Sequence, residues 1–100
     1  MDLDDKALKI LVCDLGVRPA NAAGITEVIP FVRSKKVQGN TVIIDFDEAG
    51  KGVVQSFIDA ERLCCSELTW SVTAVKGRIR LRIAGTSEQA VVVSRWFEKI

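Results

Sequence analysis

The feature that most constrains this 100-residue chain is an amphipathic helix, which residue spacing predicts over positions 52–65. Its apolar residues recur every three or four positions, so they share one face of the helix. The residues on this face are Val53, Val54, Phe57, Ile58, Glu61, Cys64, Cys65 and Leu68. With 48% hydrophobic residues, the chain can bury that face in a single core.

The predicted helix ends on two adjacent cysteines and a carboxylate. Glu61 lies three residues before Cys64 and four before Cys65, a spacing that brings side chains together on a helix. Neighbours on a continuing helix diverge by about 100°, but at a helix end both can turn toward one point. Consecutive Cα atoms, about 3.8 Å apart, are too close for an ordinary disulfide, so we expect two thiols here.

A thiol pair in a chain without histidine favours a soft, thiophilic ion over magnesium or calcium. Zinc, copper(I), mercury(II) and arsenite are the candidates. Cys13 is a possible third ligand, although parallel crossovers would place it at the opposite end of the fold. The alternative is that the cysteines only pack in the core, where this residue type is common.

Glu61 also has two interpretations. A carboxylate on an apolar helix face is rarely left without a partner. It either meets an arginine, such as Arg62 or one from the C-terminal hairpin, or it helps to hold a cation beside the thiols. The ion pair is the commoner arrangement in proteins.

Charge and composition give no reason to expect nucleic acid or a membrane as partner. The 14 basic and 13 acidic residues leave a net charge of +1. No apolar run approaches 18 residues, and the acidic residues 1–5 do not resemble a signal peptide. Three cysteines, an odd number, do not suggest a secreted disulfide framework. We therefore expect a cytoplasmic protein with reduced cysteines.

The pattern of the whole chain predicts one α+β domain over residues 1–100, built as two layers in the order β-α-β-α-β-β-α. The predicted elements are a strand over 7–15, a helix over 19–36 interrupted by Pro30, a strand over 41–46, the helix over 52–65, strands over 68–75 and 78–83, and a last helix from 86. Asp47 is the expected N-cap of the central helix. The two late strands form an antiparallel hairpin through Lys76 and Gly77. Thr86 and Gln89 have the spacing of a capping box.

Residues 61–70, Glu-Arg-Leu-Cys-Cys-Ser-Glu-Leu-Thr-Trp, resemble a motif in a family of small bacterial proteins that carry Glu-Arg-x-Cys-Cys. Cys13 and the stretch 80–85 are also similar to that family. No activity is established for the group, but some members occur near metal-responsive genes, including mercury-related ones. Ser66 and Glu67 replace its usual Pro-Phe. The resemblance implies functional roles for Cys13, Glu61, Cys64 and Cys65.

Two hypotheses follow. In the first, the protein is a non-enzymatic binding protein whose cysteine pair, with Glu61 and Cys13, holds a thiophilic ion. In the second, it is an interaction domain, such as a homodimer, whose cysteines only pack and whose hairpin meets a partner through the outward Arg78, Arg80 and Arg82. A thiol redox enzyme is disfavoured because no Cys-x-x-Cys is present.

Overall fold

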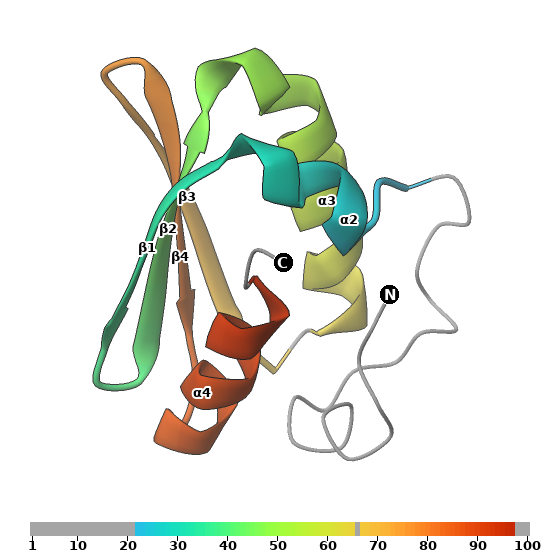
Figure 1. Ribbon diagram of the computed structural model, residues 1–100. Helices are drawn as coiled ribbons and strands as arrows, with labels where there is room; N and C mark the ends of the chain where they lie inside the picture. The colour runs from blue at the N-terminus through green and yellow to red at the C-terminus, as the bar shows by residue number, and fades with distance from the viewer. Residues whose placement is uncertain (1–21, 66, 98–100) are drawn as a thin grey trace.

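The computed structural model describes residues 22–65 and 67–97. Their elements are α2 (Ile25–Val28), the 3₁₀ turn η2 (Ile29–Phe31), β1 (Val32–Gln38), β2 (Thr41–Asp47), the 3₁₀ turn η3 (Glu48–Gly50), α3 (Lys51–Cys64), β3 (Thr69–Val75), β4 (Arg78–Ala84) and α4 (Ser87–Trp96). The helices lie on one face of a single sheet (Figure 1). The predicted α+β class with two layers is confirmed.

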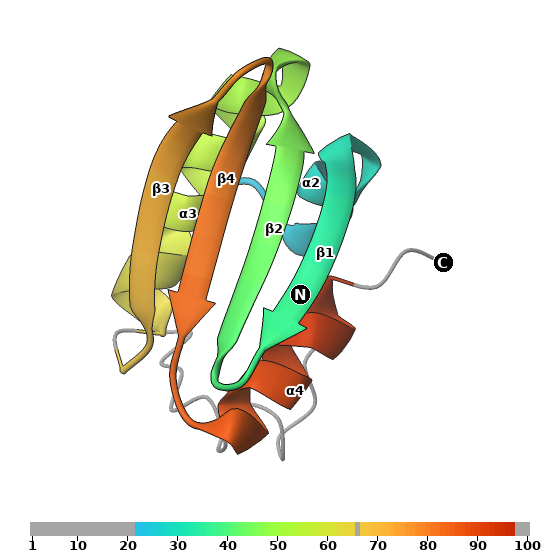
Figure 2. The same ribbon diagram turned by 90° about the vertical axis from the view of Figure 1, so that its left-hand side faces the viewer.

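The sheet contains four strands in the order β1-β2-β4-β3, and all neighbouring strands are antiparallel. Two tight turns close its hairpins. Gly39 and Gly77 occupy them with φ of 61° and 73°, a region where glycine avoids the steric penalty of a side chain. Figure 2 shows the four strands face on, with the helices behind them. The predicted C-terminal hairpin through Gly77 is confirmed.

Alternation along the strands sends one set of side chains into the core. On β4, Ile79, Leu81 and Ile83 are buried, and they face the helices. The apolar face predicted for the central helix is also buried, since α3 contributes Phe57 and Ile58 to the core. Phe57 contacts the ring of Trp96 on α4 at a centroid distance of 5.4 Å. The core therefore lies between one sheet face and the helices α3 and α4.

Within the described part of the predicted helix over 19–36, only residues 25–31 are helical, as α2 and η2. The prediction is wrong at 22–24, which are irregular, and after Phe31, where residues 32–38 form strand β1. Helical spacing continues through Val32, but Pro30 has no backbone N–H and cannot continue an α-helix. The chain makes one 3₁₀ turn after α2 and then pairs with β2 across the turn at Gly39. Tertiary pairing thus overrides the local spacing.

Two other predictions concern chain ends and caps. The Thr86–Gln89 capping box is confirmed, with the Thr86 hydroxyl accepting from Gln89 N at 3.1 Å. The prediction that Asp47 is the N-cap of the central helix is wrong, because Gly50 is the N-cap of α3; Asp47 accepts from Ala49 N at 2.8 Å and caps η3, the turn before it. The predicted strand over 7–15 and Cys13 lie outside the described residues.

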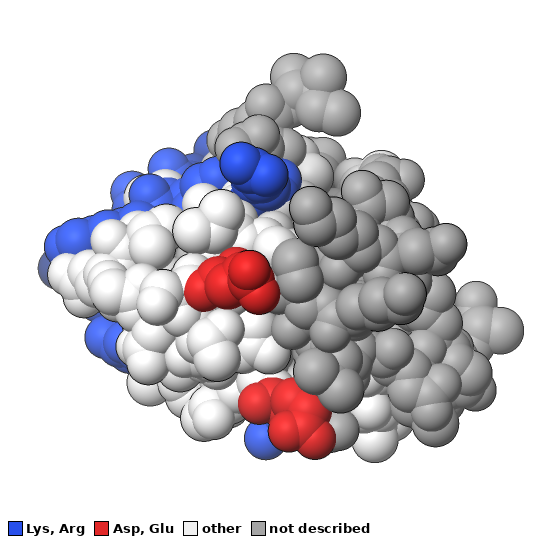
Figure 3. All heavy atoms as spheres, turned by 90° about the horizontal axis from the view of Figure 1, so that it is seen from below, with Lys and Arg blue, Asp and Glu red and all other residues white. Residues whose placement is uncertain are grey.

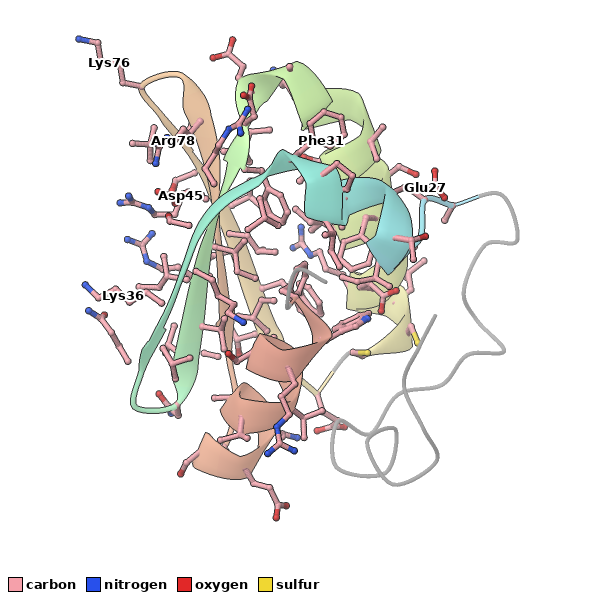
Figure 4. All side chains as sticks on the ribbon, viewed as in Figure 1. Glu27, Phe31, Lys36, Asp45, Lys76 and Arg78 are labelled. Carbon is pink, nitrogen blue, oxygen red and sulfur yellow. The ribbon has the colours of Figure 1, made fainter. Side chains whose placement is uncertain are left out.

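The sheet face opposite the helices is polar and rich in cations. Figure 4 shows Lys36, Asp45 and Arg78 on this side, away from Phe31 on the helix side. Seen from below, many of the visible Lys and Arg atoms lie toward the sheet side (Figure 3). Asp45, only 5% exposed, accepts hydrogen bonds from Arg80 at 2.8 and 3.0 Å. The hydrogen bond from Arg80 lowers the pKa of the Asp45 carboxyl.

Candidate metal centre

The C-terminus of α3 brings together the three residues that the helix face predicted. Cys64 is the last residue of α3, and Cys65 follows as its C-cap with φ −110° and ψ 59°. This departure from helical geometry turns the second cysteine back toward the residue one turn earlier. The ligand atoms of Glu61, Cys64 and Cys65 all lie within 4.8 Å of one another, so the group could hold a metal ion.

The group is completely inside the protein. Glu61 is 0%, Cys64 1% and Cys65 0% exposed. A carboxylate removed from water needs hydrogen bonds or a positive charge to compensate for lost hydration. Within the group, the Oε2 atom of Glu61 lies 3.7 Å from the Sγ atom of Cys65. Carboxylate and sulfur therefore approach each other in a region that solvent does not reach.

The two cysteines differ in covalent state. Cys64 is a thiol, whereas Cys65 takes part in a disulfide. The absence of a bond between the neighbours is confirmed, but the expectation that both are thiols is wrong for Cys65. Close Cα spacing prevents a bond between neighbours and does not prevent one to a cysteine that is distant in sequence.

The disulfide also changes the chemistry of the carboxylate contact. A sulfur in a disulfide has no proton to donate and cannot act as a thiolate ligand. The contact between Glu61 and Cys65 becomes an S–H···O hydrogen bond only when Cys65 is reduced. The reduced form is therefore the one in which both sulfurs can bind an ion.

The backbone of Cys65 fixes the helix end against β3. Its N–H donates to Glu61 O at 2.7 Å, which closes the last turn. Its carbonyl accepts from Leu68 N at 3.2 Å and from the Trp70 indole N–H at 3.1 Å. Two donors on one carbonyl leave this residue little freedom to move, so the positions of both sulfurs are defined by α3 and β3 together.

A second tryptophan, Trp96 on α4, packs against the part of α3 that lies one helical turn before the group. Trp96 packs on Phe57, which precedes Glu61 by four residues on the same face of α3. Its indole nitrogen is buried, and no hydrogen-bond acceptor reaches it among residues 22–65 and 67–97. The surroundings of the group therefore contain one indole donor that is bonded, on Trp70, and one that is not.

The hairpin arginines considered as partners of Glu61 do not reach it. Arg78, Arg80 and Arg82 lie on the sheet face opposite the helices, and Arg78 and Arg80 approach Asp45. Alternation along β4 explains this placement, because the neighbours that face the core are Ile79, Leu81 and Ile83.

Residue spacing does not reveal Trp70 as part of this site. Alternation over residues 68–75 places this tryptophan on the core face of its strand, where it is only 8% exposed. A buried indole needs an acceptor for its N–H, and a helix end offers unpaired carbonyls. Together with the position of Trp70 five residues after Cys65, these two facts are the signal from which the contact could have been predicted.

Comparisons of the chain with models of known protein families, with curated proteins and with solved structures found no match. No helix in residues 22–65 and 67–97 combines the length and apolar character needed to cross a membrane. The chemical interpretation of the site therefore depends on its own residues.

Proposed function

We propose that the reduced protein binds one thiophilic metal or metalloid ion through the thiolates of Cys64 and Cys65, with the Glu61 carboxylate beside them. The observation that carries this proposal is the convergence of three buried ligand atoms within 4.8 Å of one another. The function is binding, without catalysis. Cys13, which lies outside the described residues, is the further ligand that the sequence suggests.

The spacing of the group fits a shared ion. Ligands bound at about 2.0–2.3 Å in a tetrahedral site lie roughly 3.3–3.8 Å apart, and two sulfurs on opposite sides of an ion lie about 4.6 Å apart. The contact of 3.7 Å between Cys65 Sγ and Glu61 Oε2 matches the first arrangement. All three ligand atoms lie within 4.8 Å of one another, a separation compatible with either the tetrahedral or the linear arrangement. Little side-chain movement is therefore required for them to share an ion.

Charge balance ranks the ions. With the Glu61 carboxylate beside them, two thiolates leave a net charge of −1 around a divalent cation and −2 around copper(I), and the larger net charge is less favourable at a site that is removed from water. Thiolate ligands also select soft ions over magnesium or calcium. We therefore place zinc and mercury(II) ahead of copper(I). Arsenite, which bonds covalently to paired thiols, is the metalloid candidate.

A second candidate function is an interaction domain in which the cysteines only pack. Complete burial of both side chains within the main core favours it, because cysteine often behaves as a small hydrophobe. The two candidates differ in one respect that can be measured. Only the first requires that an ion bind to the reduced protein and be lost when the two sulfurs are removed.

The test is native mass spectrometry of the full chain with zinc, copper(I), mercury(II) or arsenite, in the presence of a competing small thiol. We expect one ion per chain in the reduced protein, and no ion in Cys64→Ser/Cys65→Ser. Without a reductant, binding should be much weaker because Cys65 is in a disulfide. Mass lost as protons on binding counts the thiolates.

Two variants make the result specific. Glu61→Gln removes the carboxylate charge and should weaken binding by about tenfold or more, by comparison with other changes beside metal ligands. Asp45→Asn is the matched control, since it neutralises a buried carboxylate on the opposite face of the sheet. Absence of an ion from the folded, reduced wild type, checked by circular dichroism, would overturn the proposal and leave the packing function.

A further inference from the structure

Within the described residues, strand β3 forms one edge of the sheet, and its outer side is unpaired there. Thr69–Val75 pairs with β4 through an uninterrupted register on its inner side. In Figure 2, β3 is the outermost strand on its side of the sheet. Within residues 22–65 and 67–97, no backbone hydrogen bond reaches the outer side of this strand. An edge of this kind can accept another strand.

The opposite edge of the sheet, β1, is protected against such pairing. It carries Arg33, Lys35 and Lys36, and a β-bulge interrupts its register between Val32 and Ser34. Lys35 also bonds to the carbonyl of Ser94 on α4 at 2.7 Å. Charges and bulges are the usual means of preventing edge pairing. Strand β3 has neither, since its sequence is Thr-Trp-Ser-Val-Thr-Ala-Val.

We infer that β3 pairs with β3 of a second copy of this chain and joins the two sheets into one. Antiparallel pairing about a two-fold axis at Val72 places Ser71 opposite the partner's Thr73 and Trp70 opposite the partner's Ala74. These are pairs of two hydroxyls and of a large with a small side chain, and both are favourable across strands. No charged residue lies within the strand to repel its copy.

The arginines of β4 are too distant from the seam to oppose this pairing. Arg80 and Arg82 lie on β4, one strand further in. Arginines of the two copies would be separated by three strand spacings, about 14 Å. This distance exceeds the screening length of about 8 Å at physiological salt. Asp45 also neutralises Arg80 directly.

The seam is short, which sets the strength we expect. An edge of only seven residues buries less surface than the roughly 1,200–2,000 Å² that is typical of stable complexes. The dimer should therefore dissociate on dilution. The pairing does not require a bound ion. A second copy is the expected partner because the residues of β3 are compatible with those of another β3 strand.

The test is sedimentation equilibrium of the full chain across about a hundredfold range of concentration. A reductant is kept present, so that no disulfide holds a dimer. We expect a monomer–dimer equilibrium in the wild type. Hydrogen exchange of the β3 amides that point away from β4 should slow as the concentration rises, while exchange in β1 stays constant. A monomer at every concentration would overturn the inference.

The variant Ser71→Glu/Thr73→Glu separates pairing from folding. Within one copy the new carboxylates face Arg82 and Arg80 across the β3–β4 ladder, which favours the folded chain. Between copies they lie directly opposite each other. The dissociation constant should rise by about tenfold or more, from two like-charge pairs across the seam. The single change Thr73→Glu should give a smaller rise and is the second variant if the double variant does not fold.

The matched control is Val37→Glu/Gln38→Glu, which adds the same charge to the β1 edge at exposed positions. It should leave the dimer intact. A dimer that survives the β3 changes, or one that the β1 changes dissociate, would show that the seam is elsewhere and would refute the inference. Exchange protection at low concentration of the β3 amides that point away from β4 would also contradict it.

Discussion

Trp70 and Trp96 allow one hydrogen bond at the candidate site to be measured against a nearly matched control. Both side chains are buried, at 8% and 7% exposed. Changing either to phenylalanine removes the same ring and the same N–H group. The difference is that Trp70 donates to the Cys65 carbonyl at 3.1 Å, whereas the Trp96 donor has no acceptor among the described residues.

The expected magnitudes follow from these partners. Loss of the smaller ring costs about 1–2 kcal/mol at either position, scaled down from the 3–5 kcal/mol of truncation to alanine. Trp70→Phe also loses a neutral hydrogen bond of about 1 kcal/mol, although the Cys65 carbonyl keeps Leu68 N as a donor. Trp96→Phe instead removes a buried donor without a partner, which recovers about 1 kcal/mol or more.

We therefore expect Trp70→Phe to lower the free energy of unfolding by about 2–3 kcal/mol and Trp96→Phe by about 0–1 kcal/mol. The difference of about 2 kcal/mol corresponds to roughly 8–16 °C in melting temperature for a domain of this size. Urea denaturation followed by circular dichroism measures both variants with no need for tryptophan emission. The Cys64 thiol should also react faster in Trp70→Phe, because the helix end beside it is less restrained.

Equal losses in the two variants would refute this reasoning, and so would a larger loss for Trp96→Phe. Either result would show that the bond between Trp70 and Cys65 contributes nothing net, or that the indole of Trp96 has an acceptor in solution. A change in the slope of the urea dependence would indicate an altered unfolded state and would require the comparison to be made from melting temperatures.

Three further predictions concern charge, packing and access. Asp45→Asn should destabilise the protein by about 1–2 kcal/mol near neutral pH. The hydrogen bond from the Arg80 guanidinium lowers the pKa of the Asp45 carboxyl in the folded protein. The stability that this carboxylate contributes is therefore complete above the unfolded pKa of about 3.9 and is lost as the pH falls through the lower folded pKa. In urea titrations, the difference in unfolding free energy between wild type and Asp45→Asn should narrow in acid, and a difference that widens would contradict this sign. Gly50→Ala should cost about 1–3 kcal/mol because a Cβ there meets the Phe31 ring, whereas Gly52→Ala, the control in open space, should be neutral or stabilising in thermal melts. The Cys64 thiol, 1% exposed, should react with a bulky thiol reagent at least about a hundredfold more slowly in the native than in the unfolded protein; comparable rates would show that it is accessible.

Local patterns predicted the second half of the fold because each was reinforced by its neighbours. Alternation in 78–83, the turn at Gly77 and the capping residue Thr86 all agree with the final pairing. The first half was harder. The helical spacing of apolar residues extends to Val32, but the helical segment ends at Phe31, just after Pro30. The strand that follows is defined by its pairing with β2, which a short stretch of sequence around residue 32 does not reveal.

The candidate site shows the same division. Helical spacing was enough to bring Glu61 to the two cysteines, because three- and four-residue separations fix the relative positions of side chains. The acceptor of the Trp70 indole and the disulfide of Cys65 depend on how α3 meets other parts of the chain. Contacts of this kind are set by tertiary packing and not by spacing.

The unequal edges of the sheet also determine how large an assembly this chain can build. Growth into a fibre needs two sites on each molecule, so that every copy joined leaves another place to add. In this sheet the cations and the bulge of β1 block pairing at the β1 edge, and in a dimer joined at β3 the β3 edge is already paired. Assembly would then stop at two copies, with a closed two-fold symmetry and no exposed template for aggregation.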